Sequence, residues 1–142
     1  MPTHADYGGC NGPFFGSRGC ALGLARVQKH GWAGLQAHTA VAGRFTAAPV
    51  HVPTADTGKT VLLTIDAPGS EGVRVGVVGD PIRTLANSVP LKGKLTEAPA
   101  FWRNPHPSHG GPAKVDLGQY KGGAVELEFA VPPGATVFAY TI

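Results

Sequence analysis

The sequence has few charged residues and no long apolar run. Only 15% of its 142 residues are Asp, Glu, Lys or Arg, and the basic ones are scattered, with Lys92 and Lys94 the nearest approach to a cluster. Nucleic-acid-binding proteins concentrate basic residues on one face, so this class is not favoured. No apolar stretch reaches the ~20 residues of a membrane-spanning helix. We therefore expect a soluble chain with neither a nucleic acid nor a membrane as its partner.

The N-terminus also lacks the marks of a targeting segment. Residues 1–6 have neither the basic start nor the apolar stretch of a signal peptide. A secretion signal would then have been removed, or would lie in a longer precursor.

Cysteine is nearly absent, and the two that occur, Cys10 and Cys20, bracket a short loop. A pair that closes a small loop between two candidate strands favours a disulfide, and disulfides form in oxidising compartments. Closing this loop would stabilise the fold by roughly 2–3 kcal/mol. Two free buried thiols are the alternative. Neither cysteine has the Cys-x-x-Cys partner or the histidine spacing of a zinc site. We expect no metal and no cofactor, and an extracellular or secretory location.

Glycine and proline are abundant, at 21 and 13 residues, while 42% of the chain is hydrophobic. So high a content of glycine and proline is unusual in a helical protein. The apolar content, in turn, is too high for a disordered protein. No segment shows sustained helical periodicity with caps. Many short strands joined by Gly/Pro turns satisfy both facts. The composition predicts one globular all-β domain with little or no helix.

Alternation of apolar and polar residues locates the clearest strands. In residues 125–131 every second residue is apolar, and we expect these apolar side chains to point inward. In residues 136–142 the same alternation predicts Phe138, Tyr140 and Ile142 on one face. Residues 60–65 and 72–78 flank a short turn, which indicates either a hairpin or a pair of strands that switches sheets. Pro49 would confine the strand around it to an edge or bulge. Strands at intervals of about ten residues indicate an antiparallel β-sandwich.

Two stretches resemble parts of a known protein family. Residues 7–9 (YGG) and 22–35 (LGLARVQKHGWAGL) resemble the YYGG and GLA-x-x-R-x-D-G-F strands at the end of a glycosidase propeller. Residues 115–129 (VDLGQYKGGAVELEF) resemble the D-L-x-x-x-x-G-K-x-V-x-L-x-F motif of the sandwich that follows it. The family is that of five-bladed propeller glycosidases of the invertase and levanase type, with their uncharacterised relatives. His30 and Trp32 depart from its acidic and Phe positions, and the loop at 103–112 is longer than usual.

The resemblance implies a concanavalin-like, or jelly-roll, sandwich at residues 37–142. Residues 1–36 would be a propeller-tail hairpin and linker. In that family the catalytic carboxylates lie on propeller blades, which would precede residue 1. No catalytic residue can be carried over, so we expect this chain not to be an enzyme by itself.

The residues also offer candidates for chemistry. Glycoside hydrolysis needs two carboxylates that face each other, and Glu126 and Glu128 share one strand face. A solvated strand face is the favoured interpretation. His106 and His109 form a His-x-x-His pair in a proline-rich loop, but they lack a third ligand of defined spacing.

The aromatic residues before this loop indicate a ligand-binding surface. Phe101, Trp102, Arg103 and Asn104 would combine a ring for sugar stacking with polar groups that bind hydroxyls. The alternative is that Trp102 anchors the core or an interdomain contact.

These observations favour a non-catalytic accessory module of a carbohydrate-active protein, which stabilises a neighbouring propeller domain or chain or contacts glycan. The second hypothesis is a structural subunit of an extracellular or capsid-like assembly, in which a free strand edge pairs with another copy. A small enzyme of unknown type is the third.

Overall fold

The structure is a computed structural model that describes residues 27, 29–54, 60–105 and 114–142. In this part of the chain nearly all regular structure is β-strand, and a single 3-10 turn, Gly118–Tyr120, is the exception. The strands are β1 Leu35–Gln36, β2 Gly43–Thr46, β3 Val50–His51, β4 Leu62–Ala67, β5 Arg74–Val77, β6 Gly93–Pro99, β7 Trp102–Arg103, β8 Lys114–Val115, β9 Ala124–Val125, β10 Leu127–Val131 and β11 Thr136–Thr141.

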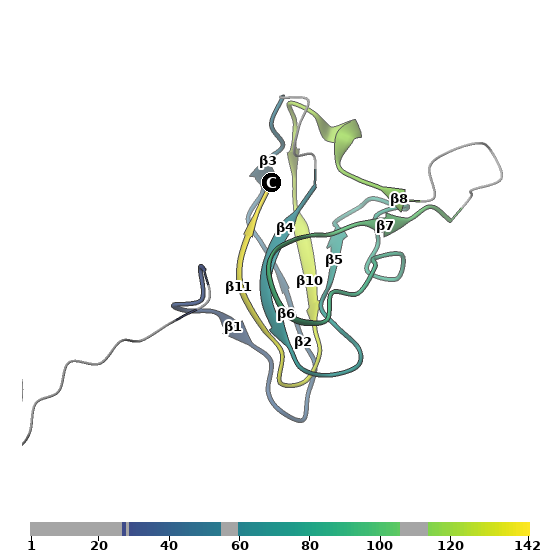
Figure 1. The fold of residues 1–142 in the computed structure, drawn as a ribbon. Coiled ribbons are helices and arrows are strands. Elements are labelled where there is room, and N and C mark those ends of the chain that lie inside the picture. Colours follow the sequence, from purple (N-terminus) through teal and green to yellow (C-terminus); the bar gives the residue numbers. More distant parts are fainter. Residues whose placement is uncertain (1–26, 28, 55–59, 106–113) are drawn as a thin grey trace, which may run out of the picture.

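Two antiparallel sheets form the body of the molecule (Figure 1). One has the strand order β1-β11-β4-β6 and the other β2-β10-β5, while β3 pairs with β9 and β7 pairs with β8. Phe129 of β10 contacts Tyr140 of β11 with ring centroids 5.2 Å apart, so the two sheets face each other across the core. The predicted all-β antiparallel sandwich is confirmed.

The alternation in β10 explains the core. Leu127, Phe129 and Val131 are buried, whereas Glu128 and Ala130 between them are partly exposed. Phe129 stacks on Phe45 of the neighbouring strand β2 at 4.6 Å. Burying an apolar side chain of this size contributes roughly 1.5–3 kcal/mol, so this central strand holds the three-stranded sheet onto the other.

Strands β4 and β5 follow each other in sequence but lie in different sheets, which settles the alternatives for residues 60–78 in favour of a sheet switch. The turn between them needs glycine at Gly72, whose φ is +75° and where a Cβ would lie 2.6 Å from the carbonyl oxygen of Leu91. Val73, Val75 and Val77 are buried, as their alternation predicted.

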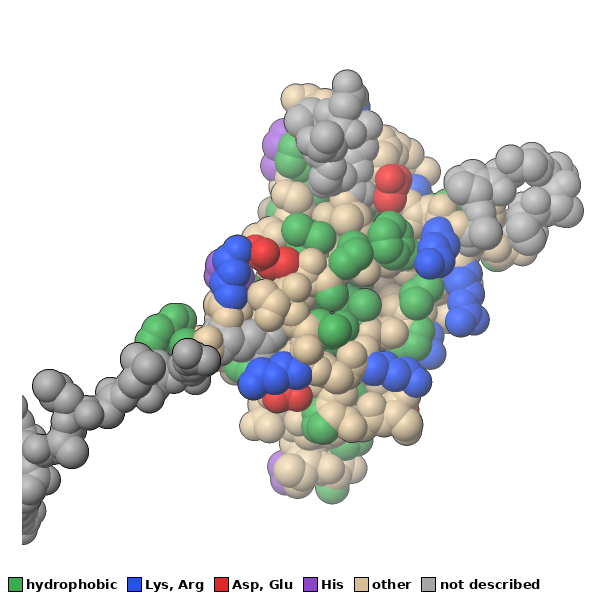
Figure 2. Space-filling view, in the orientation of Figure 1, with side chains coloured by type: hydrophobic (Ala, Val, Ile, Leu, Met, Phe, Trp, Pro, Cys, Tyr) green, Lys and Arg blue, Asp and Glu red, His purple; other side chains and the backbone are tan. Residues whose placement is uncertain are grey.

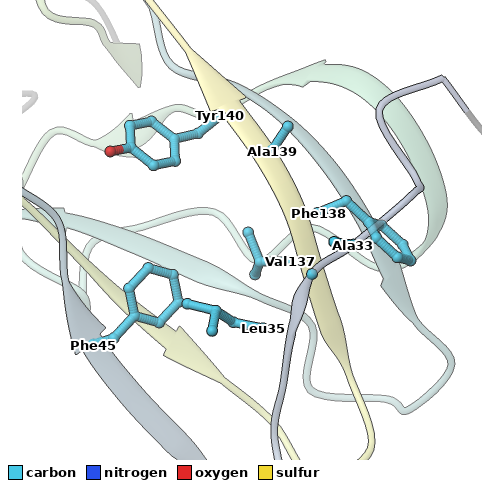
Figure 3. A pocket seen from close by; sticks show the side chains of 8 residues that line it. Ala33, Leu35, Phe45, Val137, Phe138, Ala139 and Tyr140 are labelled. Carbon is cyan, nitrogen blue, oxygen red and sulfur yellow. The ribbon is translucent and has the colours of Figure 1, made fainter.

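A bulge in β11 makes one detail of the prediction wrong. The register of β11 against β4 shifts between Val137 and Ala139, and the extra residue moves Phe138 off the face that Tyr140 occupies. Figure 3 shows Val137 and Tyr140 on one side of β11 and Phe138 on the other. Tyr140 and Ile142 pack against the core as expected. Strict alternation cannot anticipate a bulge.

A second bulge lies in β6, opposite Thr64 of β4. Glu97 adopts a φ of +50° there, and its backbone N–H donates to Thr64 Oγ1 at 3.2 Å. The carboxylate of Glu97 accepts a hydrogen bond from Lys29 Nζ at 2.7 Å. The Lys29 ammonium lowers the pKa of Glu97, and the pair ties the segment before β1 to the far edge of the sheet.

The predicted boundary after residue 36 stays a prediction, since most of residues 1–36 lie outside the described residues. So do Cys10 and Cys20, with their expected disulfide. Leu35 and Gln36 themselves form β1, at the edge of the four-stranded sheet. No helix in the described residues is long and apolar enough to cross a membrane.

A buried ion pair fixes the loop that follows β5. The side chains of Asp80 and Arg83 are only 2% and 5% exposed, and Arg83 Nη1 lies 2.8 Å from Asp80 Oδ2. Asp80 Oδ2 also accepts from the Tyr120 hydroxyl at 2.6 Å, and Oδ1 accepts from the backbone N–H groups of Ile82 and Arg83. Because every charge is matched by hydrogen bonds, the pair can be buried.

These contacts set the ionisation of Asp80. Burial by itself raises the pKa of this carboxyl, but the hydrogen bonds from Tyr120, from the backbone of Arg83 and Ile82, and from the Arg83 side chain outweigh it, so that the pKa falls from 3.8 to about 2. A carboxylate whose pKa is lowered by folding stabilises the fold above its unfolded pKa. That stabilisation, about 2 kcal/mol, is lost as the pH falls from about 4 to 2.

Asp80→Asn should lower the free energy of unfolding at pH 7 by about 3–5 kcal/mol, because it leaves Arg83 buried without its counter-charge. It should also remove the part of the acid sensitivity that Asp80 contributes between pH 4 and 2. Urea unfolding of both proteins across this range measures the two effects. Asp66→Asn, a substitution of a half-exposed aspartate in β4, should change stability by less than about 0.5 kcal/mol; an equal loss there would contradict the role given to Asp80.

Candidate functional site

Strands β7 and β8 carry the residues that the sequence singled out. Trp102 pairs with Val115 and Arg103 with Lys114. On its other side β7 is held by the loop before β6, where Val89 N–H donates to the carbonyl of Phe101 and Arg103 N–H donates to that of Asn87. The short β7 is therefore fixed along both edges.

Side chains alternate between the two faces of this small sheet. Trp102 is 0% exposed, and its indole N–H donates to the carbonyl of Val75 at 2.7 Å. Val115, its cross-strand partner, packs against the same core. Phe101, Arg103 and Lys114 occupy the opposite face, where Phe101 is half-buried and the two cations are exposed.

Trp102, which the sequence included in the predicted ligand-binding surface, is therefore not exposed to a ligand. Its ring is covered on all sides and its one polar atom is already used, so it supports the surface from beneath. The ring that a ligand can reach is that of Phe101. The alternative interpretation of Trp102, as an anchor of the core, agrees with its burial.

A hollow of about 410 Å³ opens beside the Phe101 ring. We call it the Phe101 hollow, and it is lined by Arg83, Phe101, Lys114, Val115 and Asp116. Lys and Arg side chains gather on the side of the molecule that carries β7 and β8 (Figures 1 and 2).

The buried ion pair builds one wall of the Phe101 hollow. Arg83 Nε donates to the carbonyl oxygen of Asp116 at 2.5 Å, and the guanidinium carbon lies 5.4 Å from the centre of the Tyr120 ring. Asp116 Oδ1 in turn accepts from the backbone N–H of Gly118 at 2.8 Å. The exposed carboxylate of Asp116 is thus held in place at both its backbone and its side chain.

The ammonium group of Lys114 lies over one face of the Phe101 ring. Its Nζ lies 5.6 Å from the ring centroid, near the outer limit of about 6 Å for a cation–π contact. The Phe101 hollow therefore combines an aromatic face, an ammonium and a carboxylate. An apolar ring with polar groups beside it can contact an apolar surface of a small molecule and form hydrogen bonds to its polar groups.

Glu126 and Glu128 are not brought to this surface as a catalytic pair. Glu128 forms an ion pair with Arg44 at 3.1 Å, and Glu126 is exposed between β9 and β10. His106 and His109 lie outside the described residues. Among the residues that the structure describes, no three of His, Cys, Asp and Glu are grouped as a metal site requires. Asn104 is half-buried and follows β7 directly.

Sequence reasoning missed a second hollow of about 630 Å³. Arg44 and Arg74 face Ala130 from opposite sides on the three-stranded sheet, and both line this hollow. Arg44 and Arg74 are thirty positions apart in the sequence, so their proximity could be predicted only from the register of the strands. Arg44 is engaged by Glu128, and Arg74 donates to the carbonyl of Ser88 at 3.0 Å. Because these arginines already have partners, the Phe101 hollow is the better candidate.

A third hollow, of about 620 Å³, is almost entirely apolar. It lies between β11 and β2, where Leu35, Phe45, Val137 and Tyr140 line it (Figure 3). Trp32, just before it in the chain, is 85% exposed. Strand β1 pairs with only the first two residues of β11, so among the described strands none covers that edge beyond Val137.

Comparison of this chain with family models, with curated proteins and with solved structures finds no match. No residue role is therefore carried over from another protein by these comparisons.

Trp102→Phe should lower the free energy of unfolding by about 2–4 kcal/mol, since it leaves a cavity and an unsatisfied carbonyl on Val75. Phe101→Leu, one residue away but at the surface, should cost less than about 1 kcal/mol. Urea unfolding monitored by circular dichroism compares the two variants. Equal losses would contradict the assignment of one ring to the core and the other to the hollow.

Proposed function

We propose that this chain is a non-catalytic accessory module of a carbohydrate-active protein and that it contacts glycan through the Phe101 hollow. The observation that carries the proposal is the meeting of the Phe101 ring with Lys114 and Asp116 at one open hollow. Sugars present a flat apolar face and a rim of hydroxyls. The ring suits the face, and the charged groups suit the hydroxyls.

Two further observations support this proposal. The motifs at residues 22–35 and 115–129 resemble those of sandwiches appended to propeller glycosidases. The surface that the Phe101 hollow offers is also pre-organised, since Trp102 fixes β7 from below and the Asp80–Arg83 pair fixes the backbone of Asp116. A rigid site loses less conformational entropy when a ligand binds. Contact with a neighbouring propeller, and an extracellular location, remain parts of the same proposal.

Isothermal titration of the intact chain against fructans and other plant and algal oligosaccharides tests the proposal. We expect at least one of them to bind, and Phe101→Leu to weaken that binding about threefold to tenfold through lost stacking. Phe138→Leu, which changes a phenylalanine outside the Phe101 hollow, is the matched control and should bind as the native chain does. Absence of binding across the whole panel, in a chain that is folded by circular dichroism, would refute glycan contact.

A structural subunit that pairs with its own copies is the second candidate, and the apolar hollow at β11 favours it. The edge of β11 that no described strand covers can pair with the same edge of a second copy, because antiparallel pairing of identical edges is self-complementary about a two-fold axis. The exposed side chain of Leu35, which lines the apolar hollow at this edge, would then be buried.

For this second candidate, light scattering at increasing concentration should show a dimer that Leu35→Lys returns to a monomer. A charge placed at the buried rim would be left without a partner there. Val41→Lys is the matched control, since Val41 is equally exposed, at 62% against 59% for Leu35, and does not line the hollow. A native chain that stays monomeric at millimolar concentration excludes this candidate.

A further inference from the structure

We propose that the glycan held at the Phe101 hollow is an acidic one, and that its anionic group lies between Arg103 and Lys114. This inference rests on the proposed function and names its ligand class. The shared chemistry is a charged oxygen group on a sugar ring, which can be the carboxylate of a uronic acid or a sulfate ester.

The first step is the pairing of β7 with β8. Arg103 and Lys114 are directly opposite each other in this antiparallel pair. Residues in that position carry their side chains on the same face, with Cβ atoms about 4.5–5.5 Å apart, and like charges there are destabilising. The fold therefore brings two cations together at a cost.

The second step is the absence of a compensating acid. Both side chains are exposed, and among the described residues no carboxylate forms an ion pair with either of them. This contrasts with Arg83 of the same hollow, which Asp80 neutralises, and with Arg44, which Glu128 neutralises. An anion bound between Arg103 and Lys114 would remove the repulsion between these two cations. It would not have to displace a carboxylate from either of them.

The third step is the position of the ring. Phe101 precedes Arg103 by two residues and therefore lies on the same face of the strand. Lys114 Nζ is already at the ring, but at 5.6 Å the contact is weak and exchangeable for a charged oxygen. A sugar stacked on Phe101 would thus carry its anionic substituent to the two cations.

The fourth step is the carboxylate of Asp116, which follows Lys114 by two residues and lines the same hollow. It accepts hydrogen bonds from sugar hydroxyls but repels an anion. The hollow is therefore lined by the ammonium of Lys114 and the carboxylate of Asp116, and Arg103 lies outside the lining, opposite Lys114 on the same strand face. This asymmetry orients an acidic sugar, with its charged group away from Asp116 and its hydroxyls toward it.

The experiment compares ligands that differ only in charge. Trigalacturonate and its fully methyl-esterified form are titrated into the intact chain by calorimetry, and a sulfated galactan oligosaccharide and its desulfated form make a second pair. We expect the charged member of at least one pair to bind about tenfold tighter, as a charge-assisted hydrogen bond requires. Which pair responds identifies the carboxylate or the sulfate as the anionic group.

Variants then locate the charge recognition. Arg103→Gln and Lys114→Gln should each weaken binding of the charged ligand about tenfold and leave the neutral one unchanged. Lys94→Gln, at an exposed lysine on β6, is the matched control for net charge and should have no effect. An equal loss in Lys94→Gln, or equally tight binding of polyglutamate, would attribute the effect to overall charge and overturn the inference.

The two proposals fail in different ways. If neutral and charged members bind equally, the preference for acidic glycans is wrong while glycan contact stands. If no saccharide binds to the folded chain, both are wrong.

Discussion

The buried ion pair between Asp80 and Arg83 joins two segments that the sheets alone would leave independent. Asp80 lies just after β5 and receives the hydroxyl of Tyr120, forty positions later, while Arg83 bonds to the backbone of Asp116. A buried charge is tolerated only when it is paired and hydrogen-bonded. Asp80 and Arg83 bond to each other within the loop after β5, and each makes a further hydrogen bond to residues 116–120, so the full set of contacts forms only when the two segments meet. One wall of the Phe101 hollow follows from that requirement.

The other wall depends on Trp102. Its ring fills the core under β7, and its indole N–H uses the carbonyl of Val75 in the three-stranded sheet. A strand of two residues has little stability of its own, so β7 and β8 keep their geometry because this side chain attaches them to the sandwich. With Trp102 directed into the core, the alternation of side chains along the strand places Phe101 and Arg103 on the outer face. The candidate site is thus a consequence of how two buried polar contacts are satisfied.

Much of the fold could be predicted from local pattern. The alternation at Val125–Val131 predicted β10 and its inward face, and the valines at 73, 75 and 77 predicted that of β5. Pattern failed where the period of two was broken. The bulge at Phe138 reversed one side chain, and Glu97 took a left-handed conformation that its residue type does not favour. In both cases the register of the neighbouring strand decided the outcome, and register is a property of two segments.

The candidate site divides in the same way. The sequence by itself determined the all-β class and the positions of the main turns, and it indicated residues 101–104 as a candidate surface. Composition and periodicity suffice for this because they depend on a few neighbouring residues. The sequence could not decide which ring of Phe101 and Trp102 faces solvent, since that depends on which face of β7 the core lies against. Nor could it bring Lys114 opposite Arg103, or Asp116 beside Arg83. Those contacts join residues ten or more positions apart, and only the packing of the two sheets and the burial of the Asp80–Arg83 charges place them together.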